Sequence, residues 1–150
     1  MISEIKNYVK ITNDLSSAGQ PREEQLKSIR NAGFELVINL GLHNNPEYSL
    51  RDEAGSVRSL GMSYIHIPVV FEAPSRQNLL DFFKAMDEGR GKKIFVHCAM
   101  NMRASTFISL YNIIRLCQPR DIAFAVMHMI WEPNSVWQNF IDTMLADPEL

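Results

Sequence analysis

The fold of this chain is decided by one stretch, which reads Lys92-Lys93-Ile94-Phe95-Val96-His97-Cys98-Ala99-Met100-Asn101-Met102-Arg103-Ala104-Ser105. Its apolar run, residues 94–96, is typical of a strand that is buried on both faces of a parallel sheet. A cysteine follows the strand, and after a short loop an arginine begins what reads as a helix. This order predicts that Cys98 lies at the carboxyl end of a strand, where ligands bind in open α/β sheets.

The same stretch indicates a thiolate that faces an anion. Cysteine reacts as the thiolate, and a helix N-terminus, a nearby cation and converging backbone N–H groups all favour that form. Arg103 supplies a planar cation that can grip a tetrahedral oxyanion with two parallel hydrogen bonds. We expect His97 to hold the loop in shape and Ser105 to donate to the sulfur. The loop residues expected to bind the anion are Ala99, Met100, Asn101 and Met102.

Asn101 fits such a loop because a tight cradle usually needs one residue at positive φ. Asparagine tolerates that conformation better than most residues that carry a side chain. The alternative for any single cysteine at a strand end is a small buried hydrophobic residue. For Cys98 the surrounding residues favour the anion site. For Cys117, which lies among apolar residues of an expected helix, we favour the buried hydrophobic residue.

The rest of the chain alternates strands and helices and then becomes helical. This pattern predicts an α/β fold with a small, mainly parallel sheet flanked by helices and a helical C-terminus. Residues 16–20 are expected to form a turn or an edge segment. Expected strands cover residues 8–11, 34–40, 64–69 and 94–96. Expected helices begin at Pro21 and Pro46, after the loop that ends at Ser75, and at Met102 and Pro119, and Ser135 is expected to cap a last helix.

Composition and charge limit the possible functions. Of the 150 residues, 46% are hydrophobic and 21% are charged, and the net charge is −2. We therefore expect one domain over residues 1–150 and no nucleic-acid partner. No apolar run approaches the roughly 20 residues that cross a membrane. The N-terminus lacks the apolar core of a signal peptide, so we expect a cytoplasmic protein. No Cys or His pair has metal-ligand spacing, so we expect neither a metal nor another cofactor.

These residues resemble the cysteine-dependent phosphatases, particularly the dual-specificity kind, whose loop reads His-Cys-x5-Arg-Ser/Thr. They most resemble a bacterial phosphatase-like family, DUF442, over about residues 17–110. The resemblance implies a phosphatase-like fold, no metal, and a phosphate-bearing substrate that is a small molecule or a phosphoprotein. It also implies that Cys98 forms a phosphocysteine and that Arg103 binds the phosphoryl oxygens. The segments that carry it are Ala18-Gly19-Gln20-Pro21, Gly33 to Leu40, Gly61 with Tyr64 to Val69, and Phe95 to Cys98 with Arg103.

The spacing departs from that family, because this chain has Cys-x4-Arg while Ser105 keeps its place seven residues after Cys98. Either the loop is tighter, or Arg103 sits one position early, with its side chain turned by about 100° on the helix. A Cys-x4-Arg loop also resembles rhodanese-type sulfurtransferases, which would carry a persulfide on Cys98. A catalytically weak anion-binding module, a pseudophosphatase, is the third alternative. An enzyme is favoured over such a module.

A general acid is the second requirement of a phosphatase of this kind, since the leaving oxygen needs a proton. The loop after Pro68 contains one carboxylate, Glu72, which is the candidate acid. A solvated loop charge is its alternative role. Asp52 and Glu53 are expected on the surface of a helix.

Several other residues have expected roles. His66 is expected in the core or at a sheet edge, and His43 and Asn44 are candidates to touch substrate. Phe71 is expected to line the mouth of the site. The two tryptophans, Trp131 and Trp137, are expected to anchor the C-terminal helices.

Overall fold

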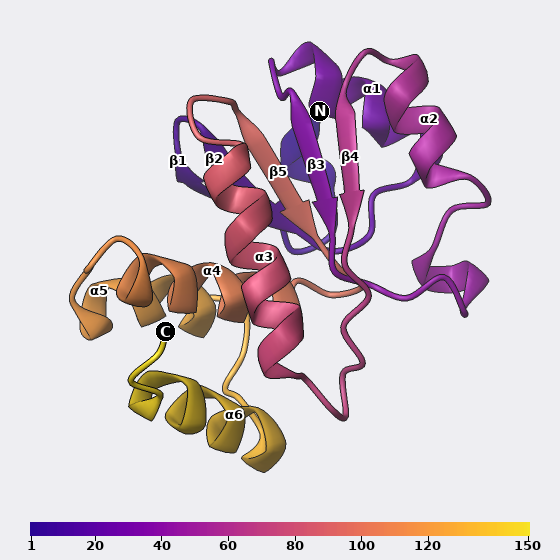
Figure 1. Cartoon of the computed structure of the whole chain (residues 1–150). Helices are drawn as coiled ribbons and strands as arrows, with labels where there is room; N and C mark the ends of the chain where they lie inside the picture. Colours follow the sequence, from indigo (N-terminus) through magenta and orange to yellow (C-terminus); the bar gives the residue numbers. More distant parts are fainter.

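The computed structural model describes all 150 residues and contains a five-stranded sheet flanked by helices (Figure 1). The predicted α/β class and helical C-terminus are confirmed. The strands are β1 (Val9–Thr12), β2 (Leu15–Ala18), β3 (Leu36–Asn39), β4 (Ser63–His66) and β5 (Ile94–His97). The helices are α1 (Glu23–Asn31), α2 (Glu53–Ser59), α3 (Arg76–Glu88), α4 (Met102–Ile114), α5 (Arg120–His128) and α6 (Ser135–Ala146), with short 3-10 helices at Ile2–Glu4 and Pro46–Tyr48. None of the helices has the length and apolar character to span a membrane.

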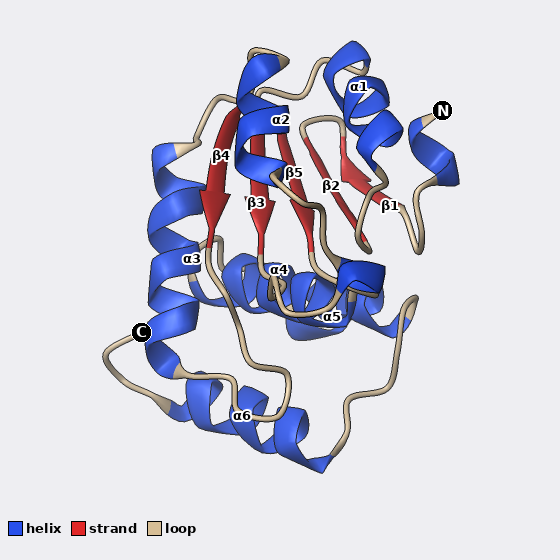
Figure 2. Ribbon diagram, turned by 90° about the vertical axis from the view of Figure 1, so that its right-hand side faces the viewer, coloured by secondary structure: helices blue, strands red, loops and turns tan.

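Strand β5 lies at the centre of the sheet, whose order is β1-β2-β5-β3-β4. Only the β1–β2 pair is antiparallel, so β2, β3, β4 and β5 end at one edge (Figure 2). The register places His97 beside Ala18 on one side and Asn39 on the other, and Asn39 beside His66. The residues that follow these strands therefore gather at the carboxyl edge around Cys98.

The sheet separates two hydrophobic clusters. Helices α1 and α2 cover one face, whereas α3 and α4 cover the other and α5 and α6 lie beyond them (Figure 2). In β5, Ile94 and Val96 pack toward α3 and α4, and Phe95 packs toward α1 and α2. Since strand side chains alternate between faces, His97 points toward α2 and Cys98 toward α4. The two neighbouring residues thus belong to opposite layers.

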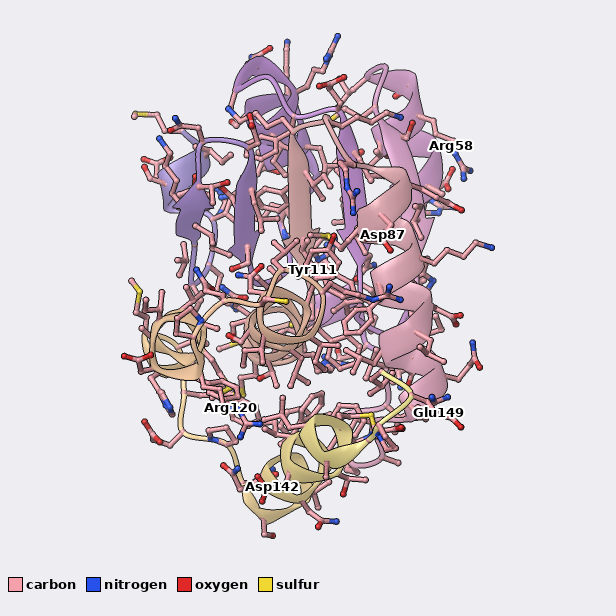
Figure 3. The ribbon with its side chains drawn as sticks, turned by 60° about the vertical axis from the view of Figure 1, so that its left-hand side comes forward. Arg58, Asp87, Tyr111, Arg120, Asp142 and Glu149 are labelled. Atoms are coloured by element: carbon pink, nitrogen blue, oxygen red, sulfur yellow. The ribbon has the colours of Figure 1, made fainter.

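Aromatic side chains hold the C-terminal helices in place. Trp137 on α6 is fully buried, and its Nε1 donates to Phe71 O at 2.7 Å. Trp131 packs against the same cluster and donates from its Nε1 to Thr106 Oγ1, so both tryptophans are packing anchors, as expected. Helices α3 and α4 are joined by Tyr111, whose hydroxyl donates to Asp87 Oδ1 at 2.9 Å (Figure 3).

Four expectations about local structure are wrong. Residues 15–18 form the inner strand β2 rather than a turn, because the buried Ser16 and Ser17 lie between β1 and β5. The helix expected at Pro46 stops after one 3-10 turn, and α2 begins only at Glu53. Cys117 is exposed and has φ 55°, since α4 has already ended. The side chain that caps α6 belongs to Asn134 rather than Ser135.

Candidate active site

Cys98 lies directly after β5, and its side chain faces a small pocket. The residue is only 1% exposed, and its backbone N–H donates to Ala18 O at 3.3 Å. The pocket has a volume of about 200 Å³ and is also lined by Phe71, Ala99, Met100, Met102 and Arg103. Central placement in the sheet therefore brings the thiol and the arginine of the motif to one opening.

The loop after Cys98 is held by its carbonyl groups. Ala99 O accepts from the N–H of Gln20 at 3.0 Å, and Met100 O accepts from Asn7 Nδ2 at 2.9 Å. The backbone N–H groups of Ala99, Met100, Met102 and Arg103 donate to no acceptor in the protein. Unpaired N–H groups beside a helix N-terminus form the kind of concavity that binds anions.

Asn101 adopts the left-handed conformation that the sequence predicts, with φ 68°. The residue is fully buried, and its Nδ2 donates to Asn7 O at 2.8 Å and to Ser17 Oγ at 3.0 Å. Asn7 Nδ2 in turn donates to Met100 O, so each asparagine side chain donates to the backbone of the segment that carries the other. The N-terminal segment thereby fixes the conformation of the loop.

Gly19 approaches this loop so closely that a side chain there would collide with it. A Cβ atom would lie 2.6 Å from Ala99 O and 3.2 Å from Lys6 O, both of which are backbone atoms. We expect Gly19→Ala to displace the loop, to lower the free energy of unfolding by about 1–3 kcal/mol, and to weaken phosphate binding. Denaturant unfolding and calorimetric titration with phosphate would measure both effects.

Gly91→Ala is a suitable control for that substitution, since no atom lies within 4 Å of the added methyl group. It carries only the backbone strain of a positive φ, which costs roughly 1–2 kcal/mol. Phosphate binding should be unchanged in this control. Equal phosphate affinity in Gly19→Ala and wild type would contradict the role given to Gly19.

Arg103 is the second residue of α4 and reaches the edge of the Cys98 pocket. Its Nη1 donates to Val69 O at 2.7 Å, and its guanidinium lies 5.9 Å from the centre of the Phe71 ring. The other guanidinium N–H groups have no acceptor in the protein. Despite the short Cys-x4-Arg spacing, the cation therefore borders the same pocket as the thiol, with donors free for a ligand.

Glu72 lies at the same opening. It is exposed on the loop between β4 and α3, and it lines a second pocket of about 220 Å³ together with Arg103, Ala99, Asn44 and Tyr48. Phe71 lines both pockets. The expected acid, cation and loop thus come from three separate segments and meet at one edge of the sheet.

Ser105, which was expected to donate to the sulfur, and two histidines lie outside the Cys98 pocket. Ser105 is buried and donates from Oγ to Met102 O at 3.2 Å, within the first turn of α4. His66 is half-buried, with its Nε2 2.7 Å from Gly41 O, and its ring lies 4.3 Å from that of His43. His43 lines a separate, larger pocket at the start of α2, so of the two candidate substrate contacts only Asn44 borders the Arg103 side.

Glu53 corrects the expectation of a surface carboxylate, because it is 1% exposed and its Oε2 lies 2.6 Å from His97 Nε2. Burial raises the pKa of Glu53, but the charge of His97 and hydrogen bonds from His97 and Gln20 hold the pKa below its ordinary value. The spacing of Glu53 and Val57, one turn apart on the buried side of α2, is the sequence signal that could have identified it.

The fold defines a phosphatase-like α/β domain of the protein tyrosine and dual-specificity type. Residues 5–136 match the family described as DSP-PTPase phosphatase fused to NAD+ kinase, and the chain belongs to this family of phosphatase-like proteins. The predicted DUF442 resemblance is confirmed by the structure of a DUF442 protein from Shewanella putrefaciens CN-32. That chain is 31% identical, superposes with a TM-score of 0.88, and aligns over 97% of this chain and 95% of its own.

Two further relatives are more distant. Tk-PTP in its active form shares the fold with a TM-score of 0.77 at 19% identity, over 92% of this chain and 95% of that one. The Beta-lactamase hydrolase-like protein of Xylella fastidiosa (strain Temecula1 / ATCC 700964) is 26% identical over 122 residues, or 80% of this chain. This chain spans only 28% of the length of that relative.

Proposed function

We propose that this protein hydrolyses a phosphomonoester through a phosphocysteine on Cys98. The observation that carries the proposal is that Cys98, Arg103 and the unpaired N–H groups of the loop border one pocket. The N–H groups and the guanidinium would bind the three non-bridging oxygens of the phosphoryl group, with the sulfur behind the phosphorus atom. The substrate class is a phosphate-bearing small molecule or phosphoprotein.

The reaction would proceed in two displacements. The Cys98 thiolate attacks phosphorus, the S–P bond forms, and the P–O ester bond breaks while Glu72 gives its proton to the leaving oxygen. Glu72, now a carboxylate, takes a proton from water as that water attacks phosphorus. The S–P bond then breaks, which restores the thiolate and releases inorganic phosphate. Arg103 offsets the negative charge of the phosphoryl oxygens in both steps.

The covalent intermediate is the direct test of this function. Wild-type protein would be mixed with an aryl phosphate and quenched in acid, and its peptides examined by mass spectrometry. We expect a phosphoryl adduct on the peptide that contains Cys98, together with release of inorganic phosphate. Steady phosphate release with no adduct in rapidly quenched samples would overturn the phosphocysteine mechanism.

Glu72→Gln tests the general acid. We expect about a 10²- to 10³-fold lower kcat on an alkyl phosphate, because its leaving oxygen requires a proton. The loss should be much smaller with p-nitrophenyl phosphate, since nitrophenolate leaves readily without one. Glu88→Gln, an exposed substitution on α3, is the matched control and should keep the wild-type kcat. An equal loss on both substrates would remove Glu72 from the acid role.

The sulfurtransferase alternative uses the same thiol, and its products distinguish it from the phosphatase reaction. Transfer of sulfur from thiosulfate to Cys98 and then to cyanide would give thiocyanate. We expect phosphate release from an aryl phosphate and no Cys98-dependent thiocyanate. Phosphate binding with neither product would instead identify the anion-binding module.

A further inference from the structure

A buried glutamate–histidine pair lies directly behind Cys98. Glu53 Oε2 and His97 Nε2 are 2.6 Å apart, and both side chains are 0% exposed. The other imidazole nitrogen, Nδ1, lies 3.3 Å from Cys98 O. Glu53 Oε1 accepts from Gln20 Nε2 at 2.8 Å, and the backbone N–H of Gln20 donates to Ala99 O. Glu53 is thus connected to the Cys98 loop by two routes.

These contacts limit where the protons of His97 can lie. A carbonyl oxygen can only accept, so the ring must present N–H at Nδ1 toward Cys98 O. Its Nε2 faces Glu53 Oε2 at 2.6 Å, and both side chains are fully buried. One proton must lie between these two atoms, since two lone pairs at that distance would repel each other.

We propose that Glu53 is a positioning residue that keeps His97 as an imidazolium beside Cys98 and, through Gln20, holds the loop carbonyls away from the pocket. The inference rests on the proposed function, in which Cys98 acts as a thiolate. A positive charge one residue from the sulfur favours the thiolate. Alternation along β5 explains the arrangement, since it sends His97 to the α2 face and Cys98 to the opposite one.

Other titratable groups face the pair and enter the design of the test. Tyr64 and His66 lie on β4, and His43 lies on the loop after β3. Burial raises the pKa of Tyr64, and burial lowers the pKa of His66. Both groups are therefore uncharged between about pH 7 and 9. His43→Gln, run in parallel, removes the third group from the profile.

The test measures the rate of alkylation of Cys98 by iodoacetamide as a function of pH, without any substrate. Cys117 is exposed, so every variant carries Cys117→Ser. Glu53→Gln keeps the size and a hydrogen bond to Nε2 but removes the charge, which lets His97 become neutral. We expect the pH midpoint of alkylation to rise by about one unit. Glu88→Gln should leave the midpoint unchanged. In Glu53→Asp, which keeps the charge, the midpoint should lie between those of Glu53→Gln and the wild type.

A second measurement requires no substitution. Nitrogen-15 NMR of labelled wild-type protein reports the protonation of both ring nitrogens of His97. We expect an imidazolium at neutral pH. A neutral ring, or an unchanged alkylation midpoint in folded Glu53→Gln, would overturn the proposal. Neither readout needs turnover. If the wild type hydrolyses no phosphomonoester but the alkylation midpoint still rises in Glu53→Gln, only the proposed function is refuted.

Discussion

Replacing Cys98 by serine is expected to lower the turnover of an aryl phosphate by about 10³-fold or more, because a hydroxyl in this position is a far weaker nucleophile at neutral pH. The change is nearly isosteric, and the side chain is buried beside Phe71 and Arg103. The pocket and its anion-binding groups should therefore persist. Initial rates of phosphate release measure the loss, and circular dichroism checks the fold.

Cys117→Ser is the matched control, since this second cysteine is exposed after the end of α4. It should retain the wild-type rate. Phosphate binding supplies a further distinction: Cys98→Ser should still bind inorganic phosphate while failing to turn over. Hydrolysis by Cys98→Ser at the wild-type rate would rule out a cysteine nucleophile.

Trp137→Ala is expected to have the largest effect on stability, a loss of about 3–5 kcal/mol, because it leaves a cavity in the core. The indole is fully buried and lies 5.6–5.9 Å, between ring centres, from Phe71, Phe107, Trp131 and Phe140. At 2–4 °C per kcal/mol for a chain of this size, the melting temperature should fall by roughly 10 °C. Calorimetry measures the change.

A milder substitution connects this helix to the site. Trp137→Phe keeps most of the packing but loses the hydrogen bond to Phe71 O, in the loop that carries Glu72. We expect a stability loss of about 1 kcal/mol and a lower kcat. Val136→Ala, which is 45% exposed on the same helix, should change neither quantity measurably. A fall in melting temperature no larger for Trp137→Ala than for Val136→Ala would contradict the anchoring role.

Local patterns were sufficient to predict the elements around Cys98. The apolar run before it, the helix after it and the tolerance of Asn101 for positive φ are all properties of neighbouring residues. Strand β2 could not be recognised in this way, because Ser16 and Ser17 are buried only through pairing with β5. Its local sequence has the polar character of a turn.

The partner of His97 was missed for a similar reason. A glutamate is buried only where a specific partner compensates for the lost hydration, and here that partner, His97, is 44 residues away in the sequence. The exposure of Cys117 depended in turn on where α4 stops. Residues whose environment is set by distant segments are thus the ones that sequence patterns place wrongly.

The reciprocal hydrogen bonds between Asn7 and the Cys98 loop have a consequence for biosynthesis. Asn7 is separated from Met100 and Asn101 by 93 and 94 positions, and β2 pairs with β5 across a similar distance. During translation the β1–β2 hairpin can form early, but one of its edges stays unpaired until β5 has left the ribosome. Closing so long a loop also slows folding. The N-terminal strands are therefore the part of the nascent chain that most needs protection from aggregation.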